Sequence, residues 1–208
     1  MQTKAVEADG LPVQNFGVFS LQRRIFSRSN IGFIFINKQS IDYHPPVDSA
    51  VYSQYNRNIG LEYNLASADN LWTGKALLMK SFSPGKQGDD YVHALNLQYS
   101  SREWLIAWQQ EAVGKNYNAE VGYVPRTGFI RLNPIVGRTF FPSGKRVLSH
   151  GPQISSSLFY DESFRSTDNE TILGHLTTFR TQSRLTLYLA HNYVKLLTPF
   201  DPTNSGLD

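Results

Sequence analysis

The sequence has no cysteine, little charge and no long hydrophobic run. The absence of cysteine from 208 residues excludes disulfides, thiolate metal sites and cysteine nucleophiles. Charged residues make up 18% of the chain, below the roughly one quarter of an average soluble domain. No stretch approaches the roughly 20 apolar residues of a membrane-spanning helix, which excludes a helical membrane protein. A chain that crosses with strands is not excluded, because only alternate residues of a strand face lipid.

Sequence signatures of catalysis and metal binding are also missing. The histidines are not paired at metal-ligand spacing, and no HExxH, GxSxG or phosphate-loop motif occurs. The stretch SPGKQGDD (83–90) lacks the acidic spacing of a calcium loop, which favours a solvated turn. Lys and Arg are scattered singly, although the net charge is +3. We therefore expect no enzyme activity, no cofactor, no metal and no nucleic-acid partner.

Alternation of apolar and polar residues is the strongest positive signal. In RNIGLEYNLA (57–66), every second residue from Ile59 to Leu65 is apolar, whereas the residues between are polar or glycine. The same period of two recurs, strongly or weakly, at 16–26, 31–41, 71–82, 91–100, 104–112, 129–141, 154–164, 170–181 and 184–195. A period of two predicts strands, here about ten of about 9–13 residues. Average globular strands have about 5–6 residues, whereas a strand that crosses a bilayer at a tilt needs about 9–11.

The links between these segments alternate in length. Short links are expected at 27–30, 69–70, 101–103 and Gln182, longer ones at 42–55, 83–90, 114–128 and 161–169, and the link 142–151 breaks the alternation. Outer-membrane barrels alternate tight turns with longer outer loops, and they carry aromatic girdles. Aromatic residues form 13% of this chain and gather near the strand ends, although they are common in strands generally. The sequence thus predicts an all-β fold. The chain would form part of an antiparallel up-and-down transmembrane β-barrel. We expect a lead-in at 1–14, the barrel domain at 15–200 and a tail at 201–208.

Several stretches resemble a known family. They are IGFIFINKQS (31–40), YNRNIGLEYNL (55–65), LMKSFSPGKQGDD (78–90) and, most specifically, NAEVGYVPRTGFIRLNP (118–134). They resemble the C-terminal barrel region of large exported proteins of Gram-negative bacteria, of unknown function. In that family a carbohydrate-binding module of the family-nine type precedes an outer-membrane β-barrel. The resemblance covers about four-fifths of the chain, and it implies an outer-membrane location, a lipid-bilayer partner and no established catalysis. The module, a signal peptide and the last strands are absent here, so we expect a piece of a longer chain.

The link 114–128 is the best candidate for a binding site. It carries Tyr117, Glu120, Tyr123 and Arg126 within ten residues. A long loop with charged and aromatic side chains can fold into a barrel and narrow it. Glu120 would then pair with Arg126 or with a residue of the barrel wall, and a structural latch without a ligand is the alternative. A polar lumen of mixed charge is expected from Asn58, Glu62, Asn64, Asn96, Gln98, Gln109, Glu111, Arg184 and Asn192.

Two functions stay open at this point. The first is an outer-membrane barrel segment that serves as a passage or a surface anchor, linked to carbohydrate binding or uptake. The second is a soluble β-sandwich or open barrel that binds a ligand such as a sugar on its aromatic residues. The two differ in what covers the apolar side of the strands, which is lipid in the first and a second sheet in the second.

Overall fold

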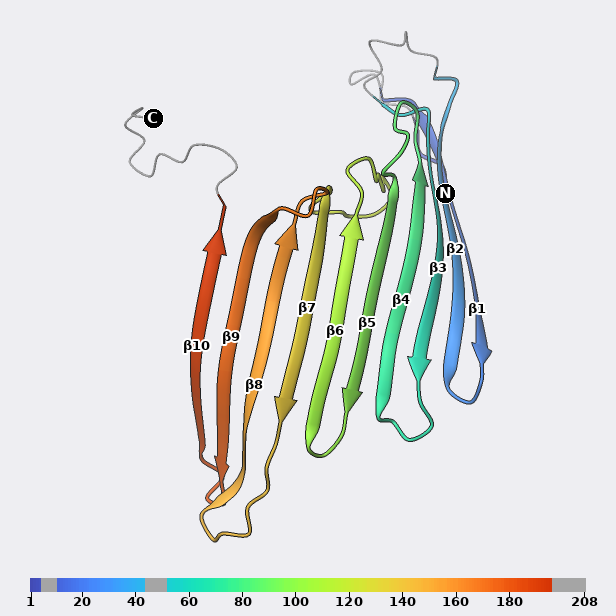
Figure 1. Ribbon diagram of the computed structural model, residues 1–208. Helices are drawn as coiled ribbons and strands as arrows, with labels where there is room; N and C mark the ends of the chain where they lie inside the picture. The colour runs from blue at the N-terminus through green and yellow to red at the C-terminus, as the bar shows by residue number, and fades with distance from the viewer. Residues whose placement is uncertain (5–10, 44–51, 196–208) are drawn as a thin grey trace, which may run out of the picture. The chain divides into compact units, whose positions relative to one another are not determined.

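The protein is built from ten antiparallel strands that follow one another in a single sheet (Figure 1). The computed structural model describes residues 1–4, 11–43 and 52–195. The strands are β1 (Val13–Ile25), β2 (Ser29–Ile41), β3 (Tyr55–Ala66), β4 (Trp72–Phe82), β5 (Tyr91–Ser100), β6 (Trp104–Val113), β7 (Phe129–Arg138), β8 (Val147–Tyr160), β9 (Ser166–Phe179) and β10 (Arg184–Val194). The described residues contain no helix long and apolar enough to cross a membrane. The predicted all-β, up-and-down order is confirmed, with β1 and β10 at the two ends of the order.

The chain divides into two compact units, which are described separately. The first comprises Met1–Gln98 and Gln110–Phe129, and so carries β1 to most of β5, the end of β6 and the link 114–128. The second comprises Tyr99–Gln109 and Ile130–Asp208, and so carries the end of β5, most of β6, β7 from its second residue, and all of β8 to β10.

In the first unit, strand register gathers apolar side chains on one face. Leu61 of β3 lies opposite Phe33 of β2 and Leu78 of β4, and Phe33 lies opposite Leu21 of β1. The rings of Phe19 and Phe33 are 6.2 Å apart between centroids. Leu61 is 52% exposed, and Leu21 and Leu78 are exposed as well. We call this surface the apolar face.

The opposite side of the first unit, which we call the polar face, buries several of its polar side chains. Asn56, Asn58 and Ser81 are 0%, 1% and 1% exposed, and they are the largest fully buried side chains among the described residues. Glu62 and Asn64 of β3 lie on this face too, as the alternation predicts. The buried apolar side chains of this unit are Ala112, Val113, Tyr117 and Phe129, at the end of β6, in the link 114–128 and at the start of β7. A soluble core buries its apolar residues and exposes its polar ones, so burial on β3 and β4 is inverted.

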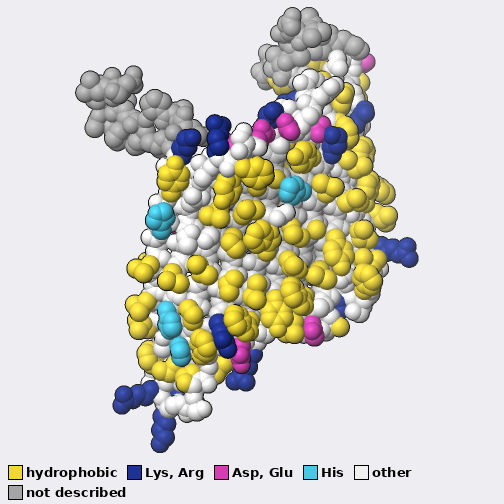
Figure 2. Space-filling model, in the orientation of Figure 1, with side chains coloured by type: hydrophobic (Ala, Val, Ile, Leu, Met, Phe, Trp, Pro, Cys, Tyr) yellow, Lys and Arg dark blue, Asp and Glu magenta, His cyan; other side chains and the backbone are white. Residues whose placement is uncertain are grey.

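In the second unit, strand register also gathers apolar side chains on one face. Ile154 of β8 lies opposite Val136 of β7 and Leu173 of β9, and Leu173 lies opposite Leu189 of β10. All four side chains are exposed. Figure 2 shows hydrophobic side chains spread over the strands, with most charged side chains near the strand ends.

One strand boundary differs clearly from the sequence-based expectation. β8 begins at Val147 rather than at 154, and β7 ends at Arg138, so the link between them is 139–146. The pair Gly151 and Pro152, which usually marks a turn, lies inside β8. A Cβ atom at Gly151 would lie 1.8 Å from the carbonyl oxygen of Arg138, so glycine is needed for this close approach.

The chain ends and the first long link have only partial counterparts in the structure. β1 begins at Val13, two residues before the expected start of the barrel domain at residue 15. Gln2 forms an isolated bridge with Asn15 of β1. Residues 44–51 of the expected link 42–55 lie outside the described residues, as does the tail 201–208. Five residues, 161–165, separate β8 from β9, so that link is shorter than expected.

Candidate functional site

The link 114–128 starts with a close contact to the link between β4 and β5. The backbone N–H of Gly114 donates to the carbonyl oxygen of Tyr91 at 2.9 Å, and that of Asn116 donates to Asp89 at 3.0 Å. A Cβ atom at position 114 would lie 2.0 Å from the carbonyl oxygen of Asp89. Glycine at this position therefore lets the two links meet, which directs the following residues over the polar face.

Asn56 is the centre of the contacts that hold this link. Its side-chain Nδ2 donates to Ser83 Oγ at 2.8 Å and to the carbonyl oxygen of Asn118 at 2.9 Å. Its Oδ1 accepts hydrogen bonds from Asn58 Nδ2 at 2.9 Å and from the backbone N–H of Glu120 at 3.2 Å. We call Asn56 and these four partners the asparagine network. Because Asn56 is fully buried, each of these bonds replaces hydration that the side chain has lost.

Glu120 joins the link to β2. Its Oε2 accepts hydrogen bonds from Lys38 Nζ and from Ser53 Oγ, both at 2.6 Å, and its Oε1 accepts one from Asn118 Nδ2 at 3.0 Å. Burial raises the pKa of Glu120, but these hydrogen bonds and the charge of Lys38 outweigh it and leave the pKa below its usual value. The sequence left two partners open for Glu120, either Arg126 or a residue of the barrel wall. In the structure, Glu120 pairs with Lys38 of strand β2.

The other three predicted site residues have different surroundings. Tyr117 is buried, its hydroxyl lies 3.7 Å from Met79 Sδ, and burial raises its pKa. Tyr123 is 87% exposed. The guanidinium of Arg126 lies over the ring of Phe129, 5.5 Å from its centroid. Tyr117 and Glu120 therefore fix the link to the strands, whereas Tyr123 is largely exposed.

A pocket of about 460 Å³ lies between the link and the strands of the first unit. Its walls are mainly apolar, and they include Ile36, Leu77, Met79, Val92, Val113 and Phe129. Polar groups reach it from Asn58, Glu111 and Arg126. Asn58 Oδ1 is buried and has no hydrogen-bond partner among the described residues. Tyr117, Tyr123 and Arg126 of the predicted site therefore line this pocket together with Glu111 of β6.

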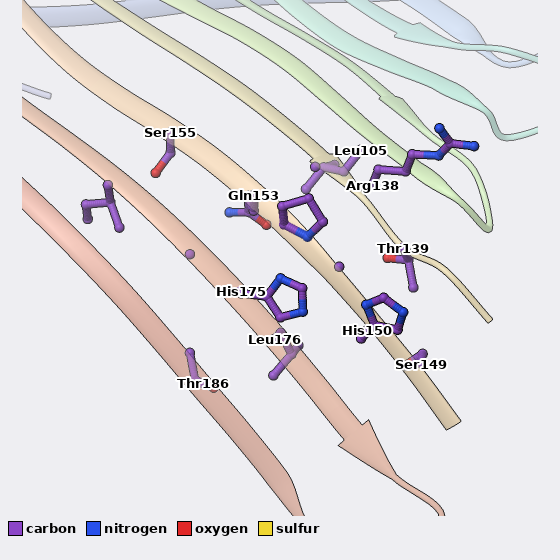
Figure 3. A pocket seen from close by; sticks show the side chains of 15 residues that line it. Leu105, Arg138, Thr139, Ser149, His150, Gln153, Ser155, His175, Leu176 and Thr186 are labelled. Atoms are coloured by element: carbon purple, nitrogen blue, oxygen red, sulfur yellow. The ribbon is translucent and has the colours of Figure 1, made fainter. Parts of the chain in front are cut away.

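The second unit has a pocket of about 420 Å³ that the sequence did not indicate (Figure 3). The imidazole rings of His150 and His175 stack there, with centroids 5.5 Å apart and planes at 24°. Phe140 stacks on His150 at 5.5 Å. Sequence spacing did not pair these two histidines, because they are 25 positions apart and the β8–β9 register brings them together. Only that register, which sequence spacing does not give, would have revealed them.

The described residues offer no obvious metal centre. No group of three or more His, Asp or Glu side chains is placed to hold a metal ion among them. Metal sites in proteins usually need three or four such ligands.

Comparisons with known proteins add nothing to this geometry. No protein-family model, no curated protein and no solved structure matches the chain. The family resemblance seen in the sequence stays a prediction.

Acidification is expected to loosen the link through Glu120. Its lowered pKa means that the carboxylate adds stability above the ordinary value of 4.5, and this stability is lost as pH falls through the lower folded-state value. For a partly exposed ion pair we expect about 1 kcal/mol, or about a fivefold loss of amide protection. Hydrogen exchange of the Asn118 and Glu120 amides, corrected for intrinsic rates, measures this loss.

Two isosteric variants separate this effect from general acid unfolding. Glu120→Gln should have lower protection already at neutral pH and little further loss below pH 4.5. Glu103→Gln, in the turn between β5 and β6, should titrate like the unchanged chain. If Glu120→Gln keeps the full pH dependence, Glu120 is not the group responsible.

Proposed function

We propose that the chain forms part of the wall of a bacterial outer-membrane β-barrel, with the apolar face against lipid and the polar face towards the interior. The observation that carries this proposal is the inverted burial on β3 and β4. Asn56 and Asn58 are buried, whereas Ile59 and Leu61, next to them on β3, are 38% and 52% exposed. So many exposed apolar side chains indicate a surface that contacts other apolar material, and the hydrocarbon of a lipid bilayer supplies such material.

The arrangement of the strands fits lipid better than a second protein layer. In a β-sandwich the apolar face packs against another sheet about 10 Å away. All strands of the described residues belong to one sheet, so these residues supply no second layer. The strands are 10–14 residues long, which is enough to cross a bilayer at a tilt.

Cation–aromatic pairs near the strand ends also support the proposal. In the first unit, the guanidinium of Arg57 lies 4.8 Å from the ring centroid of Tyr55. In the second, Arg138 lies 4.9 Å from the ring of Trp104, and Arg102 lies over Phe141 at 4.5 Å. Arginine side chains extend their charge towards water while their stems stay in apolar surroundings, and aromatic rings favour the membrane interface.

The firmly held link favours an anchoring role over an open passage. The asparagine network and the Lys38–Glu120 pair, 2.6 Å apart, hold 114–128 over the polar face. In a barrel the link would occupy the interior and narrow it. A barrel of this kind would anchor other parts of a longer protein at the cell surface, and a link to carbohydrate binding rests on the family resemblance alone.

Tryptophan quenching tests whether the apolar face meets lipid. Trp72, Trp104 and Trp108 are each between 36% and 43% exposed. In vesicles whose acyl chains carry bromine, we expect most of their emission to be quenched. Trp108 lies inside β6, so deep bromines should quench it best, whereas Trp72 and Trp104 begin their strands and should respond to shallow ones. Variants that keep one tryptophan, with phenylalanine at the others, assign each signal.

The soluble alternative predicts the reverse result. A β-sandwich or open barrel would stay in the aqueous phase, bromolipids would leave its emission unchanged, and iodide in water would quench it. That pattern would contradict the proposed location, provided that circular dichroism shows the strands to be formed.

A further inference from the structure

The second unit is strongly basic at one end of its strands. β6, β8 and β10 begin at this end, and β7 and β9 end there. The basic residues at this end are Arg102, Arg138, Lys145, Arg146, Arg180 and Arg184, and the acidic residue among the described ones is Glu103. Near the other end lie the basic residues Arg131, Arg165 and Lys195 and the acidic residues Asp161, Glu162, Asp168 and Glu170. Figure 2 shows Lys and Arg side chains at the lower ends of these strands.

An arginine and four rings form a continuous row across this end. The guanidinium of Arg138 lies 4.9 Å from the ring centroid of Trp104 and 4.8 Å from that of Phe140. Phe140 stacks on His150, and His150 stacks on His175, with 5.5 Å between the centroids of each pair. We call these residues the arginine–aromatic row. The row extends from the start of β6 to β9.

The row lies on the side of the sheet that carries the exposed apolar residues of this unit. Arg138 follows Val136 by two positions on β7, and His150 precedes Ile154 by four positions on β8. Residues an even number of positions apart on a strand share a face. Phe140 forms a bridge with His150 and shares its side. If this side meets lipid, as proposed above, the row lies near the headgroups, and the inference below rests on that location.

Two guanidiniums at this end are available to a ligand. Arg102 and Arg138 are exposed, and no ion pair or hydrogen bond involves either guanidinium among the residues that the structure describes. Arg102 lies over the ring of Phe141, 4.5 Å from its centroid. A ring covers the flat side of a guanidinium and leaves the N–H groups at its edge free. Those N–H groups form the planar fork that matches a phosphate group.

The two arginines lie close together because β6 and β7 are joined between them. The backbone N–H of Thr139 donates to the carbonyl oxygen of Glu103 at 2.7 Å. Arg138 and Arg102 are each one residue from this bond, on the two chain segments that it joins. Diagonal positions of this kind lie roughly 7–8 Å apart, within reach of long side chains.

We infer that this end of the second unit binds the headgroup of an anionic phospholipid. Arg138 donates to the phosphate, and Arg102 adds a second positive charge beside it. The rings of Trp104 and Phe140, 36% and 39% exposed, contact the glycerol and the upper acyl chains. The remaining basic residues of this end keep the surrounding potential positive, which favours a lipid with net negative charge.

Other ligands with a phosphate group fit this end less well. A zwitterionic phospholipid carries no net charge, and its cationic choline would lie close to the arginines. A dissolved phosphate ion would gain the charge interaction but would leave the exposed rings beside it without contact. A phosphate carried by an anionic lipid uses both the guanidiniums and the rings.

Quenching of Trp104 by brominated lipids with two different headgroups tests this site. The full chain is folded into phosphatidylcholine vesicles with Trp72 and Trp108 replaced by phenylalanine. A minor share of the lipid carries bromine near the headgroup end of its acyl chains, either as phosphatidylglycerol or as phosphatidylcholine. We expect phosphatidylglycerol to be enriched at Trp104 at least about fivefold over its bulk share, as for one basic side chain near an anionic surface. Added salt should reduce this enrichment.

Two matched double variants separate a binding site from general surface charge. Arg102→Gln with Arg138→Gln should abolish the enrichment, because no guanidinium remains beside Trp104. Arg165→Gln with Lys195→Gln removes the same charge from the other end of the unit and should leave the enrichment unchanged. Circular dichroism shows whether the strands form in each variant, and the comparison of the two lipids on the chain with its own arginines needs no change at the site.

The inference is overturned if both brominated lipids quench Trp104 alike, or if both double variants lose the enrichment equally. In either case Trp104 is still quenched, so the proposed membrane location stands. If neither lipid quenches Trp104, the membrane location fails and the lipid site fails with it. The two failures are therefore distinguishable.

Discussion

Replacing Leu61 with arginine is expected to destabilise the folded chain in a bilayer by about 2–4 kcal/mol, the cost of a cation on the lipid face near the midplane. Leu61 lies inside β3, opposite Phe33 and Leu78, and is 52% exposed. The guanidinium would have to enter hydrocarbon or distort the strand to reach water. Urea titration of the chain folded into lipid vesicles, followed by tryptophan emission, measures this loss.

The matched control places the same charge on the other face of the same strand. Asn64 lies on the polar face, where its Nδ2 donates to Asn30 Oδ1 and Glu62 Oε1. An arginine there retains donors for Glu62, so Asn64→Arg should change stability by less than about 0.5 kcal/mol. Equal costs for both variants, or a neutral Leu61→Arg, would show that the apolar face does not meet lipid.

A clear period of two predicted five of the strands and a weaker pattern the other five, because the period depends only on the extended backbone and on the two faces having different surroundings. One stretch does not alternate, and the structure explains it. Phe33, Ile34, Phe35 and Ile36 form a continuous apolar run. Phe33 and Phe35 lie opposite Leu61 and Ile59, whereas Ile36 lines the pocket on the other side. The run is apolar on both faces because the link 114–128 covers part of the polar face.

The start of β8 was not predictable from local signals. Gly151 and Pro152 normally mark a turn, and β8 continues through them because the carbonyl of Arg138 approaches where a side chain would otherwise lie. This approach depends on the neighbouring strand. The residue pattern within one segment therefore does not reveal that β8 continues through Gly151 and Pro152.

The sequence pointed to the link 114–128 as a candidate site, but not to the contacts that this link makes. The composition of the link pointed to Tyr117 and Glu120, yet Glu120 pairs with Lys38, 82 positions earlier in the chain. Asn56, the centre of the network, falls at a strand start and has no distinguishing sequence signal. Long-range partners of this kind follow from register and link path, which are properties of the whole sheet.

Replacing Asn56 with leucine is expected to release the link and to destabilise the first unit by about 3–5 kcal/mol. The substitution leaves the carbonyl of Asn118, the N–H of Glu120 and the Nδ2 of Asn58 without their partner, and an unpaired buried group costs about 1–3 kcal/mol. Water entering the loosened link would recover part of this cost. The measurements are urea unfolding and hydrogen exchange of the Glu120 amide, which donates directly to Asn56.

The control is a leucine at an asparagine that supports no such network. Asn37 accepts one hydrogen bond, from Arg57 Nε at 3.1 Å, and Asn37→Leu should cost about 1 kcal/mol or less. It should leave the Glu120 amide as protected as before. If Asn56→Leu also leaves that amide protected, the link is held by packing of Tyr117 and by the Lys38–Glu120 pair. A polar network would then not be what closes the interior.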